Sequence, residues 1–287
     1  VRSKLYYVKY ELENGQGFLT VASTRPETIM GDTALCVHPE DERYKHLIGQ
    51  KAKVPLVNRW VTIIADDYID IEFGTGVLKV TPAHDINDYN LGIKHKLQVI
   101  DVLNPDGTLS EAAEIMVGED RFIARKKSAK MLVEQGLLEK EEEITNSVGT
   151  SERTGAVIEP RISMQWFLKM EHLAKPALEV VENDTVKLHP PKFKGMYRAW
   201  MENVHDWCIS RQLWWGQQIP AFYLSDGTIV VASTKTEALA IALEKHPDLV
   251  KSEADLNQDP DVLDTWFSSW LWPISVFDGF KNPDNAD

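Results

Sequence analysis

The sequence predicts a mixed α/β protein whose N-terminal part forms a closed or nearly closed β-barrel with peripheral helices. Two observations support this fold class. The first half alternates short β-type runs with turns and only brief helices, which favours a barrel over a doubly wound sheet. After about Pro160 aromatic residues cluster and prolines mark connections, so a piece of different architecture is expected. We therefore expect one domain over residues 1–160 and another over residues 161–287.

The first domain is expected to be built mainly from strands. They are predicted at residues 5–13, 17–23, 34–37, 51–57, 61–65, 77–81 and 99–103. Asn14 and Gly15 form the pair that suits a tight hairpin between the first two strands. Helices are predicted at residues 39–47, from Asp85 to about His95, and at residues 119–135. The inward face of the longest is expected to carry Phe122, Ile123, Leu132 and Val133.

The remaining elements are predicted from charge and periodicity. The run at residues 139–143 is most simply a solvated charged edge. Helical spacing over residues 195–207 predicts burial of Tyr197, Trp200 and Val204. Further on we expect a strand at 229–232, a helix at 236–246 and an amphipathic segment at 261–272.

Composition excludes several classes of protein. The 287 residues are 43% hydrophobic and contain no apolar run long enough for a membrane span, and the first ten residues do not resemble a signal peptide. A cytoplasmic protein is the expectation. Cys36 and Cys208 alone cannot build a disulfide framework or a cysteine zinc cluster. The formal charge of −13 argues against a generic nucleic-acid-binding surface, although the acid excess sits mostly towards the C-terminal end.

A polar stretch at residues 74–89 joins a predicted strand to a predicted helix. Asp85 suits a helix N-cap and Asp88 can complete a capping pair, so both acids can be purely structural. A binding function is the alternative, because ionisable and hydroxyl side chains crowd this junction. They are Lys79, Thr81, His84, Asp85 and Asp88. Binding groups often collect on loops held by rigid elements, and both interpretations stay open.

Several kinds of catalytic or cofactor-binding site are excluded because the chain lacks their motifs. It has no GxSxG nucleophile elbow, no GxxxxGK[ST] phosphate loop, no dinucleotide fingerprint and no HExxH zinc helix. The second polar segment, STRPET at residues 23–28, places Pro26 at the first position of a helical turn that can hold an anionic or carbonyl oxygen. Together the two segments suit a pocket for an amino-bearing substrate, with water as the attacking group.

Six motifs in order closely resemble the valyl-tRNA synthetases. They are STRPET, GTGVLKVTPAHDINDY, ERTGAVIEP, MQWF, DWCISRQLWWG and DVLDTWFSS. Isoleucyl enzymes typically have His-Thr-Ala-Pro and a His-Gly pair in the second motif, and leucyl enzymes have Met-Ala-Val-Pro. The order Lys79, Val80, Thr81, Pro82 with His84 and Asp85 is the valyl pattern.

The resemblance implies a barrel-like editing (CP1) domain of the valyl, isoleucyl and leucyl type. A partial, Rossmann-like segment of the catalytic domain is implied after it. The HIGH and KMSKS signatures are absent from these 287 residues, so no aminoacylation is expected from them alone.

The resemblance also implies roles for individual residues. Asp85 anchors the α-ammonium group of the substrate, and Asp88 binds the threonine hydroxyl. Lys79 and Thr81 complete the catalytic set on the same wall. Arg25 meets the terminal adenosine or its phosphate. The other expected substrate- and tRNA-binding residues are Ser23, Thr24, Glu27, Thr28 and His84.

The implied function is post-transfer editing, the hydrolysis of mischarged threonyl-tRNA(Val), as part of a valine–tRNA ligase. A pocket that binds valine cannot strongly reject threonine, and this pair is the established example of that limit. Editing is expected to need no cofactor and no metal, since ATP and magnesium serve only the full-length synthetase. The expected partner is the acceptor end of tRNA(Val) carrying threonine, and the protein is expected to be a monomer that binds no membrane.

Two alternatives to threonyl editing remain. The chain can be a tRNA acceptor-end binding module without independent hydrolytic activity, its acids serving only as helix caps. Isoleucyl-type editing of valyl esters is disfavoured by Lys79 and Asp85.

Overall fold

The computed structural model describes residues 1–13, 15, 17–152 and 154–282. Its chain forms two compact units, Val1–Ser163 (unit 1) and Met164–Asp287 (unit 2). Helices and strands occur in both units, so the predicted mixed α/β class is confirmed.

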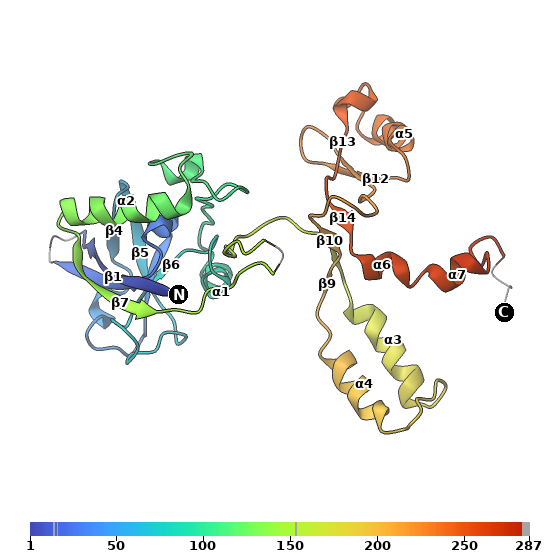
Figure 1. Ribbon diagram of the computed structural model, residues 1–287, viewed down its shortest axis with the longest axis horizontal. Helices are drawn as coiled ribbons and strands as arrows, with labels where there is room; N and C mark the ends of the chain where they lie inside the picture. Colours follow the sequence, from blue (N-terminus) through green and yellow to red (C-terminus); the bar gives the residue numbers. More distant parts are fainter. Residues whose placement is uncertain (14, 16, 153, 283–287) are drawn as a thin grey trace. The chain divides into compact units, whose positions relative to one another are not determined.

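In the described part of unit 1 the strands β1 to β7 form two sheets (Figure 1). The first is antiparallel, with the strands β2 (Phe18–Ser23), β1 (Arg2–Glu11) and β7 (Leu138–Thr145) in that order. The second has the order β4 (Lys51–Val54), β5 (Arg59–Ala65), β3 (Ala34–Val37) and β6 (Val77–Val80). Only the β3–β5 pair is parallel in it. The hydrogen-bonded ladders of the described residues therefore do not form one closed barrel.

The two sheets share one core. Alternate residues of β1 point inward, which buries Tyr6, Val8 and Tyr10, as the period of a strand requires. At the seams between the sheets, β2 packs beside β6, and an isolated bridge joins Leu12 of the β1 chain to Ala52 of β4. The end of β2 and the end of β6 are thus brought close together.

Helices cover the sheets and fill their connections. They are α1 (Ile86–His95), α2 (Arg121–Glu134) and the short 3₁₀ helices Pro26–Gly31, Lys45–Leu47 and Glu111–Ala113. The α2 helix places Ala124 and Leu132 in the same core cluster as the strands. Its Phe122, Ile123 and Val133 are exposed, so the prediction that they face inward is wrong and only that for Leu132 is confirmed. The buried stripe of α2 consists of Ala124, Ser128 and Leu132, which are spaced four residues apart.

Local side-chain bonds explain two further wrong predictions. In the predicted helix 39–47 only Lys45–Leu47 is helical, because Asp41 bonds the backbone and guanidinium of Arg43 and stabilises a turn. Residues 99–103 form no strand beyond an isolated bridge at Leu103, since the N–H of Val102 donates to the His84 ring. The charged run 139–143 is solvated as predicted, and it belongs to β7, a strand that was not predicted. Asn14 of the predicted hairpin turn lies outside the described residues.

Unit 2 is built from short elements. Its strands are β8 (Phe167–Leu168), β9 (Trp207–Cys208), β10 (Ser210–Arg211), β11 (Ala221–Tyr223), β12 (Ile229–Val231), β13 (Asn257–Gln258) and β14 (Val262–Leu263). Its helices are α3 (Glu171–Glu182), α4 (Phe193–Glu202), α5 (Lys235–Lys245), α6 (Thr265–Ser269), α7 (Trp272–Val276) and the 3₁₀ helix Glu253–Asp255. The main core cluster forms where α5 packs on the β12-β11-β13 sheet.

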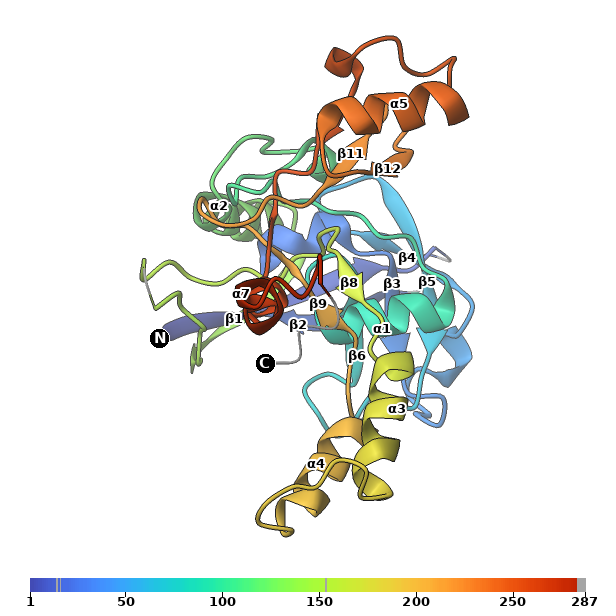
Figure 2. The ribbon, with the colours of Figure 1, turned by 90° about the vertical axis from the view of Figure 1, so that its right-hand side faces the viewer.

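The helices α3 and α4 lie side by side as a hairpin (Figure 2). Arg198 of α4 binds the carboxylate of Glu182 on α3 through two nitrogens, at 2.9 and 2.5 Å. Trp200 is 78% exposed, so its predicted burial is wrong, and Tyr197 and Val204 are only partly buried. Helical spacing identified an apolar face on α4, but no described residue covers Trp200. Among the helices of the described residues, none has both the length and the apolar character needed to cross a membrane.

Candidate functional site

A cavity of about 310 Å³ in unit 1 collects nearly all of the predicted site residues. They reach it from the end of β2 and the following turn, from β6, and from the start of α1. The predicted residues that line it are Ser23, Thr24, Arg25, Thr28, Lys79, Thr81, His84, Asp85 and Asp88. A larger cavity of about 520 Å³, lined by Lys9, Lys53 and Gln135 among others, contains none of them.

The two acids at the start of α1 make different contacts. Asp85 is the N-cap, and its Oδ1 accepts from the backbone N–H groups of Asn87 at 2.8 Å and Asp88 at 3.2 Å. The carboxylate of Asp88 does not cap the helix in return. Its Oδ2 accepts from the N–H of Thr81 at 2.8 Å, while its Oδ1 has no hydrogen-bond partner among the described residues. Capping is thus confirmed for Asp85 and wrong for the side chain of Asp88.

Asp88 is a buried carboxylate, with only 6% of its surface exposed. Burial disfavours the charged form and raises the pKa of Asp88 to about 6, against the opposing effect of the Lys79 ammonium. At neutral pH the side chain is therefore charged and largely buried, and the described residues donate a hydrogen bond to only one of its two oxygens. A carboxylate in this state is a strong acceptor for a ligand hydroxyl.

Lys79 and Thr81 form a polar network with Asp32. The Lys79 ammonium lies 2.5 Å from Oγ1 of Thr81, 3.3 Å from Oδ1 of Asp32 and 3.4 Å from Oγ1 of Thr28. The Thr81 hydroxyl donates to Asp32 at 2.6 Å, and Tyr10 donates to the second oxygen of Asp32 at 2.6 Å. Three protein oxygens thus fix the Lys79 ammonium as a positive charge on the cavity wall.

Sequence reasoning missed Asp32. It is fully buried, and desolvation raises its pKa above the ordinary value. A signal was present, since Asp32 is the one acid in the otherwise apolar run that leads into β3, and a buried charge requires partners. What the sequence does not reveal is that those partners come from β1 and β6.

The turn after β2 supplies Ser23, Thr28 and Arg25. The Oγ of Ser23 accepts from the N–H of Arg25 at 3.1 Å, and Thr28 Oγ1 donates to the carbonyl of Arg25 at 3.0 Å. These bonds shape the turn, and Pro26 begins the 3₁₀ helix as the sequence predicted. Thr24 lines the cavity beside them.

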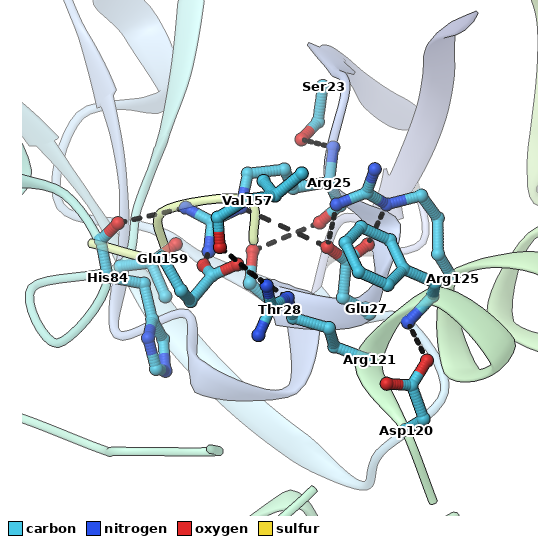
Figure 3. A network of polar contacts seen from close by, with 12 residues as sticks. Ser23, Arg25, Glu27, Thr28, His84, Asp120, Arg121, Arg125, Val157 and Glu159 are labelled. Atoms are coloured by element: carbon cyan, nitrogen blue, oxygen red, sulfur yellow. Dashed lines mark hydrogen bonds and ion pairs between the residues drawn. The ribbon is translucent and has the colours of Figure 1, made fainter. Parts of the chain in front are cut away.

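Glu27 is the predicted site residue that does not line the cavity. It is fully buried, and its carboxylate binds Arg125 of α2 through two nitrogens, at 2.9 and 2.6 Å (Figure 3). This pair packs the 3₁₀ helix Pro26–Gly31 against α2. The contacts of Glu27 therefore place it behind the wall of the cavity rather than on its surface.

His84 accepts rather than donates at its Nε2 atom. The N–H of Val102 donates to it at 3.1 Å, and burial lowers the pKa of His84 to about 4. The imidazole is therefore neutral at physiological pH, and the lone pair of Nε2 is already used. The backbone carbonyl of His84 accepts from Arg25 at 2.9 Å. These contacts disfavour His84 as the group that activates water.

Two other kinds of chemistry find little support. Burial raises the pKa of the Cys36 thiol to about 12, so it is not a nucleophile at neutral pH. The described part of the chain contains no group of three or more His, Cys, Asp or Glu side chains arranged to hold a metal ion.

Valine–tRNA ligases of several bacteria are similar to this chain over nearly its whole length. A valine–tRNA ligase of Parabacteroides distasonis is 61% identical over 287 residues, which are 99% of this chain and 33% of that relative. A valine–tRNA ligase of Carboxydothermus hydrogenoformans is 52% identical over 273 residues, covering 95% of this chain and 30% of that relative. The chain thus spans about a third of the length of these relatives.

A solved ternary complex of Agrobacterium radiobacter K84 LeuRS with tRNA and LeuAMS aligns with a TM-score of 0.39 and 16% identity, over 98% of this chain and 32% of that one. The family model of class I tRNA synthetases (I, L, M and V) matches residues 23–287. Together with the relatives, this match confirms the resemblance seen in the six motifs. The chain belongs to the class I tRNA synthetases of the isoleucine, leucine, methionine and valine group.

Proposed function

We propose that unit 1 hydrolyses the ester of mischarged threonyl-tRNA(Val), as the editing part of a valine–tRNA ligase. The observation that carries this proposal is the buried carboxylate of Asp88. One oxygen is held by Thr81, and the other has no partner among the described residues of a cavity large enough for an amino acid. A threonine hydroxyl can donate to that oxygen. A valine methyl group cannot, and would leave a buried charge unpaired.

The amino group of the substrate is assigned to Asp85. Its Oδ1 is occupied by the first N–H groups of α1, but Oδ2 has no hydrogen-bond partner among the described residues. The cap fixes the carboxylate at the cavity edge, so capping and ammonium binding are compatible. Asp85 and Asp88 lie one helical turn apart, which suits an amine and a side-chain hydroxyl on one small substrate.

The ester is broken by water. A water oxygen bonds to the carbonyl carbon, the bond from that carbon to the ribose oxygen breaks, and the ribose oxygen takes up a proton. The Lys79 ammonium offers a fixed positive charge to the developing oxyanion, held in place by Asp32, Thr81 and Thr28. We assign the terminal adenosine to the wall made by Ser23, Thr24 and Arg25.

The proposal extends to the whole chain. Unit 1 is assigned to the barrel-like editing type, because β2 beside β6 and the Leu12–Ala52 bridge lie at both seams between its sheets. Unit 2 is assigned to a partial return into the catalytic domain. We propose no cofactor for editing, with ATP and magnesium needed only for aminoacylation by a full-length enzyme. The partner is the acceptor end of tRNA(Val), bound by a cytoplasmic monomer.

A binding module without hydrolytic activity is the second candidate. The contacts of Asp85 favour it, because one of the two carboxylate oxygens already accepts hydrogen bonds from the start of α1 and so has a structural function without any substrate. The two candidates differ in one measurable respect, because only the first shortens the lifetime of threonyl-tRNA.

The test compares deacylation of threonyl-tRNA(Val) and valyl-tRNA(Val) by the chain and by its Asp88→Ala variant. We expect the wild type to hydrolyse the threonyl ester preferentially. The variant should lose about 10- to 100-fold of that rate, the value of a hydrogen bond to a charged group. Asp67→Ala removes an exposed acid that does not line the cavity and serves as the matched control. If threonyl-tRNA is as stable with the wild type as in buffer, the hydrolase proposal fails and the binding module remains.

A further inference from the structure

Five charged residues form a cluster beside the cavity. The arginine–glutamate cluster consists of Arg25, Glu27, Arg121, Arg125 and Glu159 (Figure 3). Glu27 binds Arg125, whereas Glu159 forms ion pairs with both Arg25 and Arg121. Only Arg25 also lines the cavity. The cluster therefore connects a residue of the cavity wall with groups that no substrate needs to touch.

Glu159 comes from the last part of unit 1, after its final strand β7. Residues 157–162 are held in place at several points. Arg121 donates to the carbonyl of Val157 at 2.8 Å, the Ile162 N–H donates to the carbonyl of Ala83 at 3.1 Å, and Arg161 pairs with Asp101 at 2.9 Å. This segment, named the strap, thus brings the carboxylate of Glu159 to Arg25 from a distant part of the sequence.

Each nitrogen of the Arg25 guanidinium has a protein oxygen nearby. Nη1 donates to the carbonyl of His84 at 2.9 Å, Nη2 pairs with Glu159, and Nε lies 3.9 Å from Oε1 of Glu27. The side chains of Arg25 and Glu159 are only 23% and 13% exposed. Exposed ion pairs contribute little, but removing one partner of a largely buried pair leaves the other charge uncompensated. The orientation of Arg25 therefore depends on Glu159.

We propose that Glu159 is a positioning residue for hydrolysis of the aminoacyl ester and acts through Arg25. This inference rests on the proposed editing function and adds the strap to the residues that editing requires. Glu159 itself touches neither the ester nor the attacking water. It fixes the guanidinium that meets the terminal nucleotide, and a displacement of a positioning group by about 1 Å can cost 100-fold in rate.

The experiment is a double-mutant cycle on the whole chain. Deacylation of threonyl-tRNA(Val) is measured for the wild type, Glu159→Gln, Arg25→Gln and the variant that carries both changes. We expect Glu159→Gln to lower kcat/KM about tenfold or more. The double variant should be no slower than Arg25→Gln, because Glu159 has no effect once Arg25 is gone. Glu152→Gln removes an exposed acid just before the strap and should leave the rate unchanged.

Each outcome decides the inference. It is overturned if Glu159→Gln matches the wild type, if Arg25→Gln has no effect, or if the two losses multiply in the double variant. A purely structural role would make the losses multiply and lower the melting temperature in parallel. Should Glu159→Gln fail to fold, Glu159→Asp takes its place, because it keeps the buried charge but shortens its reach. An inactive wild type would instead contradict the proposed function itself.

Discussion

Asp88 combines two properties that are unfavourable for folding. It is nearly completely buried, and one carboxylate oxygen lacks a partner among the described residues. The pKa of about 6, against an ordinary value of 3.8, means that the native state holds its proton more tightly than the unfolded chain does. Stability therefore falls as the pH rises through this range, and above pH 6 the charge destabilises the fold by up to about 3 kcal/mol.

A neutral side chain at this position should stabilise the fold. We expect Asp88→Asn to raise the melting temperature at pH 8, where the wild-type carboxylate is charged. At pH 5 about half of this gain should vanish, because the native carboxyl is then largely protonated while the unfolded chain, with the ordinary pKa of 3.8, is still mostly ionised. Thermal unfolding followed by circular dichroism at the two pH values measures the difference, with the exposed Asp67→Asn as the control. A stabilisation that is the same at both pH values would contradict the assigned burial cost.

Asp32 marks the limit of sequence reasoning at this scale. Asp85, Asp88, Lys79 and Thr81 lie within one continuous motif, so the sequence alone could predict that they meet. Asp32 follows the STRPET segment closely, yet its partners Tyr10 and Lys79 come from separate strands. The pairing of β3 with β6 brings Asp32 to Lys79, and β1 of the other sheet supplies Tyr10.

At the scale of elements, the N-cap residue of α1, Asp85, has a structural function as a cap and a proposed function in binding the substrate amine. Asn and Asp cap helices about equally well, whereas Ala costs about 1 kcal/mol. We therefore expect Asp85→Asn to keep the melting temperature but to raise the KM for threonyl-tRNA(Val), because the charge for the ammonium is lost. Asp85→Ala should lower both stability and affinity.

The matched control for this prediction is the N-cap of the other long helix of unit 1. Asp120 caps α2 and accepts from the N–H groups of Phe122 and Ile123, but it does not line the cavity. Asp120→Ala should reduce stability alone. If Asp85→Asn leaves the KM unchanged, Asp85 is only a cap and its assignment to the substrate amine fails.

Helix faces were harder to predict than helix positions. The start of α1 at Asp85 and the bounds of β3 agree with prediction, because a cap and a short apolar run are local signals. In α2 the sequence favours Phe122 and Ile123 as core, but Ala124 and Leu132 pack in the core cluster. Arg121 and Arg125 cover the ring of Phe122 at 4.7 and 5.4 Å instead. Which face of a helix is buried depends on the elements that pack against it, and the spacing of apolar residues within the helix does not identify those elements.

At the scale of the whole chain, the two units differ in the size of their cores. The main cluster of buried apolar residues among the described residues has 23 members in unit 1 and 8 in unit 2. Several aromatic side chains of unit 2 are largely exposed, including Trp200, Trp214, Trp215 and Trp266. Since burial of apolar area drives folding, unit 2 should be the less stable of the two.

Urea unfolding should therefore occur in two steps. Of the nine tryptophans only Trp60 lies in unit 1, so the fluorescence of a Trp60→Phe variant reports unit 2 alone. We expect its emission to change at lower urea than the loss of threonyl-tRNA deacylation, which reports unit 1. Coincident transitions by the two probes would indicate that the units unfold as one.

The pairing of β1 with β7 also constrains how unit 1 is made on the ribosome. Arg2 pairs with Thr145, and β1 is the middle strand of its sheet. During synthesis, one edge of β1 stays without its native partner until β7 has emerged, and open strand edges invite pairing with other chains. The charges of β7 then protect the outer edge of the finished sheet. A pause in translation before residue 138 would thus prolong the interval in which nascent chains can aggregate.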